Sequence, residues 1–175
     1  SPEGTFNAVY SGNEYHCGIQ DTGQVECWGR HPFERRDRLI PSDTFRSLAL
    51  SSERACGLTS SGDLKCWGET SEECFGPGHS GTDFSSEVIE FEVPEGQFLH
   101  IDMNRSYGCG VRPSGALECW GCNGYGQSSP PDGTYRAVST GGSHACAVAT
   151  DNSVQCWGSN KDGQASPPKG LRVAE

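Results

Sequence analysis

The sequence has little of what builds a helical domain or a large apolar core. Of its 175 residues only 33% are hydrophobic, and a single methionine and four tryptophans stand against 24 glycines and 10 prolines. No apolar run approaches the roughly 18 to 20 residues that a membrane-spanning helix needs. This scarcity predicts short strands joined by many turns, around a core thin enough to need covalent support.

Basic residues are also few. The chain has 13 lysines and arginines and 23 aspartates and glutamates, which gives a net charge of −10. Nucleic-acid surfaces carry basic stripes, so this balance argues against a nucleic-acid partner. Cysteine is abundant instead, with ten residues. An even number of cysteines in a turn-rich chain is typical of disulfides and of an oxidising compartment, and it indicates a secreted or surface-exposed protein.

The cysteines and tryptophans occur in a repeated pattern. Cys-Trp-Gly stands at 27–29, 66–68, 119–121 and 156–158, and a second cysteine precedes each of these by ten positions. An opening segment with two apolar positions begins each repeat, as in "GTFNAV" (4–9), "DTFRSL" (43–48), "GQFLHI" (96–101) and "GTYRAV" (133–138). Repeats of about 40 residues that read as strands point to propeller blades or a β-solenoid.

Each repeat is predicted to contain an opening strand and a β-hairpin. In the first hairpin, Cys17 and Cys27 each lie five residues from Thr22, so they stand directly opposite one another. Opposed residues are close enough for a bridge. The same spacing predicts the pairs Cys17–Cys27, Cys56–Cys66, Cys109–Cys119 and Cys146–Cys156.

The tryptophans fall on the other face of each hairpin, where we expect them to fill the space between hairpins. The residues opposite them are His16, Ala55, Gly108 and Ala145, and the three small ones leave room for an indole. The structural residues of this prediction are Trp28, Trp67, Trp120 and Trp157. The alternative is that these indoles form platforms for a ligand.

Opening segment, hairpin and the motif "CWGxNxxGQ" together resemble the repeat of the regulator of chromosome condensation family of β-propellers. The motif is fullest in "CWGCNGYGQSSPPDG" (119–133) and "CWGSNKDGQASPPKG" (156–170). The paired cysteines are most similar to the extracellular versions, such as the ectodomains of Crinkly-type plant receptor kinases and bacterial surface proteins. A secreted propeller-type inhibitor of β-lactamases is a further relative. The resemblance implies an all-β, β-propeller-like array of disulfide-stapled hairpins.

We expect one domain over residues 1–175. Its repeats span about 4–42, 43–95 with an insertion at 69–93, 96–132 and 133–169, and residues 170–175 form a partial opening strand. Such propellers usually close a ring with seven blades, whereas this chain has four repeats. A small closed ring, an open arc and a segment of a longer array all remain possible.

Two cysteines stand outside the pattern, and no cofactor or metal is expected. We predict that Cys74 and Cys122 form a fifth disulfide that ties the insertion to the next repeat. The alternative is a redox or zinc site at Cys119-x-x-Cys122, but a zinc site usually has a second pair of ligands. Calcium in the acidic stretch 69–92 is a further alternative, although no ordered set of ligands appears there.

Catalysis is not expected, because the sequence lacks a nucleophile elbow, a phosphate loop and a His-Glu-x-x-His motif. Loops on a rigid scaffold are the usual place for binding. The residues two before the first cysteine of each hairpin are Tyr15, Arg54, Tyr107 and His144. With the nearby Arg105, they are the predicted ligand contacts, since tyrosine and arginine are enriched at binding hot spots. The alternative is that they cover blade edges. Phe75, Phe84 and Phe91 make the insertion a second candidate surface.

The function these observations indicate is an extracellular or cell-surface binding module. It would be an adhesin or receptor ectodomain that recognises a surface glycan or protein ligand. A secreted inhibitor that binds and blocks a partner enzyme is the alternative. We expect no membrane insertion, and either a homo-oligomer or a place in a longer surface protein.

Overall fold

In the part of the chain that a computed structural model describes, the regular secondary structure consists of short antiparallel strands. The structure describes residues 4–30, 40–68, 71–74, 87–90 and 92–174. Within these ranges, strands lie in four three-stranded sheets and one two-stranded sheet. No helix in these ranges is long and apolar enough to span a bilayer.

Each three-stranded sheet is one repeat, in which the opening strand pairs with the first strand of the hairpin. The first blade contains β1 (Phe6–Ser11), β2 (Tyr15–Gln20) and β3 (Val25–Gly29). The second contains β4 (Phe45–Leu50), β5 (Arg54–Thr59) and β6 (Leu64–Gly68). The third contains β9 (His100–Met103), β10 (Tyr107–Val111) and β11 (Leu117–Gly121). The fourth contains β12 (Tyr135–Thr140), β13 (His144–Ala149) and β14 (Val154–Gly158).

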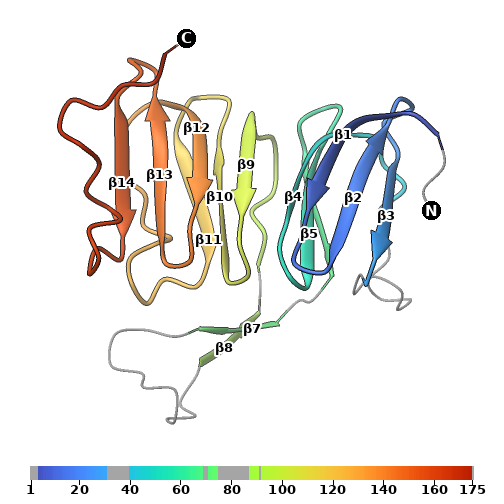
Figure 1. The fold of residues 1–175 in the computed structure, drawn as a ribbon, viewed down its shortest axis with the longest axis horizontal. Helices are drawn as coiled ribbons and strands as arrows, with labels where there is room; N and C mark the ends of the chain where they lie inside the picture. Colours follow the sequence, from blue (N-terminus) through green and yellow to red (C-terminus); the bar gives the residue numbers. More distant parts are fainter. Residues whose placement is uncertain (1–3, 31–39, 69–70, 75–86, 91, 175) are drawn as a thin grey trace.

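The insertion in the second repeat forms a hairpin of its own, which the sequence did not predict. It consists of β7 (Ser71–Cys74) and β8 (Glu87–Glu90), and it projects from one end of the sheets (Figure 1). Phe75, Phe84 and Phe91 of the insertion lie outside the described residues.

The expected hairpin register is confirmed in all four blades. The cysteines are directly opposed, with Cα atoms 4.0 to 4.1 Å apart. The disulfides are Cys17–Cys27, Cys56–Cys66, Cys109–Cys119 and Cys146–Cys156, with Cys74–Cys122 as the fifth. The hairpin turns need a left-handed residue, and Gly23 (φ 84°) and Asn152 (φ 69°) supply it. Disulfide-stapled hairpins are therefore the repeating unit.

The core lies between blades rather than within one sheet. The disulfide-bearing face of each hairpin packs against the tryptophan-bearing face of the next blade. One cluster joins the first and second blades through Tyr15, Cys17, Ile19, Phe45, Leu48, Ala55 and Trp67. The next joins the second and third through Ala49, Cys56, Leu58, Leu64, Phe98, Ile101, Met103 and Trp120. The last joins the third and fourth through Tyr107, Cys109, Val111, Tyr135, Val138, Ala145, Ala147 and Trp157.

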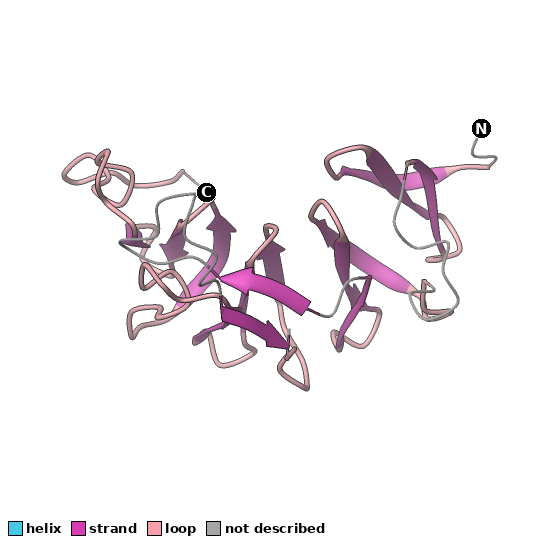
Figure 2. Ribbon diagram, turned by 90° about the horizontal axis from the view of Figure 1, so that it is seen from below, coloured by secondary structure: helices cyan, strands magenta, loops and turns pink. Residues whose placement is uncertain are grey.

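The four sheets form an open arc and do not close a ring (Figure 2). The first and last blades lie at its two ends, and the chain termini lie with them (Figure 1). The segment after the fourth blade begins a fifth opening strand, but one position later than the sequence suggests. The Val173 amide donates to the Asn152 carbonyl, just as the Phe45 amide donates to the Gly23 carbonyl. Val173, rather than Arg172, therefore takes the place that Phe45 holds at the start of β4.

Candidate functional site

Three of the five predicted ligand contacts are buried. Tyr15, Arg54 and Tyr107 lie at the start of the central strands β2, β5 and β10, where the neighbouring blade covers them. The prediction that their side chains form a binding surface is wrong, because solvent does not reach them. Burial also raises the pKa of Tyr15 and of Tyr107, so both phenols keep their protons.

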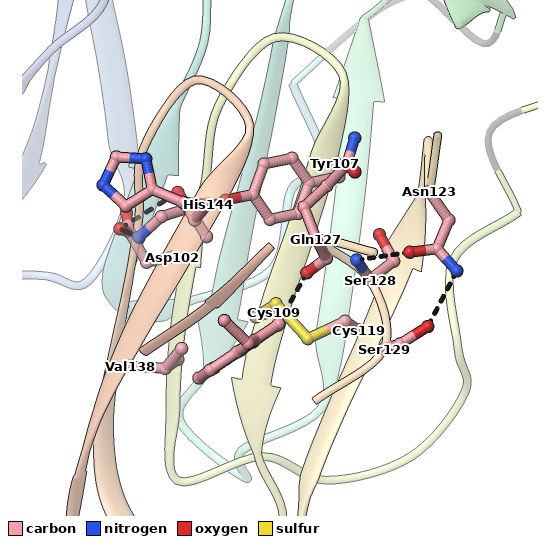
Figure 3. Close-up of a disulfide and its surroundings, with 12 residues drawn as sticks. Asp102, Tyr107, Cys109, Cys119, Asn123, Gln127, Ser128, Ser129, Val138 and His144 are labelled. Carbon is pink, nitrogen blue, oxygen red and sulfur yellow. Dashed lines mark hydrogen bonds between the residues drawn. A yellow bond between two sulfur atoms is a disulfide. The ribbon is translucent and has the colours of Figure 1, made fainter. Parts of the chain in front are cut away.

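These buried side chains tie each blade to the next. The Tyr15 hydroxyl donates to the Arg54 carbonyl at 3.0 Å. Arg54 Nη1 donates to the Arg105 carbonyl at 3.1 Å. The Tyr107 hydroxyl donates to the His144 carbonyl, toward which Figure 3 shows the ring extending. The position two before the first cysteine is thus a repeated inter-blade hydrogen-bond donor, since a buried polar group needs a partner.

The other two predicted contacts remain at the surface. Arg105 is exposed, and His144 is half-buried at the open end of the arc. His144 occupies in the fourth blade the place that Tyr107 occupies in the third. A role for Arg105 and His144 in ligand binding stays a proposal.

A polar clamp that the sequence did not reveal joins the opening strands β9 and β12, which are the inner strands of the third and fourth blades. Asp102 Oδ2 accepts the Thr140 amide at 2.7 Å and the Thr140 hydroxyl at 3.2 Å. Asn104 Nδ2 donates to the Gly141 carbonyl. One feature of the sequence could have indicated this clamp. β9 has an aspartate at the position that Tyr10, Ala49 and Ser139 hold in the opening strands of the other three blades.

Three of the four tryptophans, Trp67, Trp120 and Trp157, lie between blades, as expected of packing residues. Trp67, Trp120 and Trp157 are buried, whereas Trp28 is partly exposed on the first blade. The Trp157 indole also donates to the Gln127 carbonyl at 2.8 Å.

The Asn-x-x-Gly-Gln motif holds the loop that supplies this carbonyl. Asn123 Oδ1 accepts the Ser128 amide at 2.9 Å, and Gln127 Oε1 accepts the Tyr125 amide at 2.8 Å. Figure 3 shows Asn123 bonded to Ser128 and Ser129 beside the Cys109–Cys119 bridge. The motif therefore shapes the outer loop so that the next tryptophan finds an acceptor.

The opening strands β1, β4, β9 and β12, together with β13 and β14 of the fourth blade, line a groove of about 640 Å³. Its walls come from all four blades and from the segment after the last one. They are Tyr10, Leu48, His100, Ile101, Asp102, Ala137, Val138, Ser139, Cys146, Ala147, Val148, Val154 and Val173. A concave, largely apolar surface with a few polar groups is the usual form of a binding site. We take this groove as the candidate functional site.

Its polar groups are Tyr10, His100, Asp102 and Ser139. His100 Nδ1 lies 3.5 Å from the Val138 amide. Burial lowers the pKa of His100, with Arg46 acting in the same direction and the Asp102 carboxylate opposing it. The imidazole is therefore kept mainly neutral and can accept a hydrogen bond. Within the described ranges, no cluster of three or more histidine, cysteine or acidic side chains could hold a metal ion.

The sequence of the fourth repeat matches a known family. Residues 135–164 match the Regulator of chromosome condensation (RCC1) repeat. No curated protein matches the sequence of the chain.

Solved structures match the fold over nearly the whole chain. The Crinkly ectodomain of the receptor kinase ACR4 from Arabidopsis thaliana is 21% identical, with a TM-score of 0.67 over 89% of this chain and 51% of that one. The ectodomain of the receptor kinase CR4 from Physcomitrella patens is 19% identical, with a TM-score of 0.67 over 100% of this chain and 46% of that one. Prp20p from Saccharomyces cerevisiae is 13% identical, with a TM-score of 0.66 over 90% of this chain and 46% of that one.

The chain therefore has the fold of RCC1-type β-propellers, and residues 135–164 of its fourth repeat are similar to the RCC1 repeat. It spans about half the length of the structures it resembles. The expected resemblance to the RCC1 and Crinkly-type propellers is confirmed, and the fold class it implies is confirmed with it.

Proposed function

We propose that this chain is an extracellular binding module without catalytic activity, and that its inner groove holds a segment of a protein ligand. The observation that carries the proposal is the groove itself, because four rigid, stapled blades converge on one concave surface. Pre-formed sites lose little conformational entropy on binding, which favours affinity.

The chemistry of the groove favours a protein segment with apolar side chains. Leu48, Ile101 and Val148 supply apolar walls, while Tyr10 and Asp102 supply polar groups between them. A surface glycan is the second ligand class, since a tyrosine ring and a carboxylate can both bind a sugar. The net charge of −10 opposes an acidic or nucleic-acid ligand.

The known proteins with this fold support a binding role. ACR4 and CR4 are receptor kinases whose ectodomains carry it. The Prp20p structure was described together with its binding to Gsp1p and histones. Five disulfides fit the extracellular setting of the receptor ectodomains better than the inside of a cell.

The test is a screen of the folded, oxidised chain against arrays of extracellular protein domains and of glycans. Any hit is then measured with Ser139→Arg, which places a long side chain in the groove at an exposed position. The expected result is at least a tenfold loss of affinity, because the added side chain occupies the space of the ligand.

Ser114→Arg is the matched control. It makes the same change at an exposed turn of the third blade, outside the groove. It should bind like the wild type. If both variants bind equally well, the ligand lies elsewhere, and Arg105 and His144 become the next residues to replace.

A further inference from the structure

Among the described residues that line the groove, Asp102 alone carries a charge at neutral pH. The others are apolar or neutral, because burial lowers the pKa of His100 and keeps its imidazole mainly uncharged. Arg46 lies near His100 but does not line the groove, and its guanidinium donates to the Phe98 and Leu99 carbonyls. The groove therefore has one negative charge on walls that are largely apolar.

The Asp102 carboxylate is held in place by the neighbouring blade. The Thr140 amide and the Thr140 hydroxyl both donate to Oδ2, at 2.7 and 3.2 Å. No described residue donates to the other oxygen, Oδ1. Asp102 is half-buried, so its carboxylate has one oxygen bonded within the protein and one available to a ligand. Both partners belong to the contact between the third and fourth blades, so the position of the carboxylate is determined inside the four-blade arc rather than at its ends.

The fold itself does not require a carboxylate at this position. Tyr10, Ala49 and Ser139 stand at the equivalent places in the other three opening strands, and those strands pair with their hairpins in the same register. The charge is therefore particular to the third blade, where it faces the groove.

A ligand that fills the groove must bring a hydrogen-bond donor to Asp102. A purely apolar segment would remove water from Oδ1 and give nothing in exchange, and a charge taken out of water is costly unless it is paired and hydrogen-bonded. A cationic donor makes the strongest bond to a carboxylate. The apolar walls and the single carboxylate are thus complementary to a long apolar side chain that ends in a positive charge.

The free oxygen suits a lysine better than an arginine. A guanidinium binds a carboxylate best through two parallel hydrogen bonds, one to each oxygen, but Oδ2 already accepts two bonds from Thr140. An ammonium group is a compact point charge that needs only Oδ1. Tyr10 and Ser139 line the same groove and have hydroxyl oxygens that accept further ammonium protons.

We infer that the segment held in the groove carries a lysine whose ammonium group pairs with Asp102. Leu48, Ile101 and Val148 then pack against the methylene stem and the flanking side chains. The inference rests on the proposed function, because it names the ligand chemistry of the same groove. Asp102 is the residue that determines specificity for this ligand.

The test uses two pools of synthetic peptides that differ at one position. Each peptide has varied apolar residues on both sides of a central residue, which is lysine in one pool and Nε-acetyl-lysine in the other. The folded, oxidised chain is incubated with each pool, and the retained peptides are quantified by mass spectrometry. The lysine pool should be retained at least about tenfold more, because acetylation removes the charge and keeps the stem.

Asp102→Asn removes the charge from the groove but keeps an oxygen that can accept the Thr140 amide. It is expected to lose the preference for lysine at least about tenfold, and to retain the acetyl-lysine pool as the wild type does. Asp162→Asn is the matched control, because it makes the same change at an exposed residue of the fourth repeat's outer loop, outside the groove. It should keep the preference, which separates Asp102 from the net charge of the chain.

The Thr140 amide reports on the carboxylate directly, because it donates to Asp102 Oδ2. Its NMR signal should shift when a retained lysine peptide is added to the wild type, and should stay in place with the acetylated peptide. This measurement needs no variant, so it gives a result even if Asp102→Asn is unfolded.

Equal retention of the two pools by the wild type would overturn the inference, and so would an Asp102→Asn variant that keeps the preference for lysine. If the pools are retained equally and Ser139→Arg abolishes their binding, the groove stands and only the role of Asp102 falls. If neither pool binds, or if Ser139→Arg leaves binding unchanged, the proposed function fails and the inference falls with it.

Discussion

The indole nitrogen of Trp157 lies 2.8 Å from the backbone carbonyl of Gln127, which is 30 residues earlier in the chain and in the preceding outer loop. Both partners belong to the repeated motif, since Gln127 ends Asn-x-x-Gly-Gln and Trp157 is the centre of Cys-Trp-Gly. The motif of the third repeat therefore joins that repeat to the fourth as well as shaping its own outer loop.

This bond predicts two separable effects at Trp157. Trp157→Phe keeps an aromatic ring but leaves a buried carbonyl without its donor, at an expected cost of about 1–3 kcal/mol in the free energy of unfolding. Trp157→Ala also creates a cavity between blades and should cost about 3–5 kcal/mol. Urea unfolding measures both. Equal stability of Trp157→Phe and the wild type would show that the hydrogen bond contributes nothing.

The glycines of the central strands make a second prediction. A Cβ atom on Gly57 would lie 2.5 Å from Cδ1 of Phe45, and the equivalent Gly18 and Gly110 face Phe6 and Phe98 in the same way. Because a packed ring cannot easily move, Gly57→Ala should destabilise the protein by about 1–3 kcal/mol.

Gly142→Ala is the control for this change. Nothing lies within 4 Å of a Cβ atom at Gly142, so its stability should stay within about 0.5 kcal/mol of the wild type. Thermal unfolding of both variants gives the comparison. Equal melting temperatures for the two would contradict the requirement for glycine beneath the ring.

The local features of the fold could be predicted from the sequence. The pairing of Cys17 with Cys27 follows from counting residues on either side of a turn, because a hairpin register depends on its own few residues. The same counting places Trp28 on the opposite face. Periodicity and motif spacing then give the number of blades.

Features that depend on the neighbouring blade could not be predicted in this way. Tyr15, Arg54 and Tyr107 look like surface residues within one repeat, and only the next blade buries them. The Asp102–Thr140 clamp joins residues 38 positions apart in different sheets, so no local pattern indicates it. The groove likewise requires four blades in a defined arc.

The disulfides should differ in how much they contribute to the free energy of unfolding. Cys74–Cys122 closes a segment with a sequence separation of 48, whereas Cys56–Cys66 closes one of 10. Chain entropy then predicts a loss of about 4 kcal/mol for Cys74→Ser with Cys122→Ser, and about 3 kcal/mol for Cys56→Ser with Cys66→Ser. Denaturant unfolding without reductant measures both, after mass spectrometry has shown no free thiols in the wild type. A larger loss for the hairpin pair would mean that native packing, rather than the unfolded chain, determines the effect.

His100 predicts how stability depends on pH. Burial lowers its pKa in the folded protein below the usual value of 6.5, so the unfolded chain binds a proton more readily. Stability contributed by His100 is therefore complete above about pH 6.5 and is lost as the pH falls below that value. His100→Gln cannot take up this proton. The stability of the wild type relative to His100→Gln should consequently fall between pH 7 and pH 5.

The comparison is made by urea unfolding of both proteins at several pH values. Because carboxylates titrate in both proteins, their contribution cancels in the difference between the two. A difference that stays constant from pH 7 to pH 5 would mean that His100 is solvated in the folded state. A difference that grows in favour of the wild type would mean that Asp102, rather than burial, controls the proton on His100.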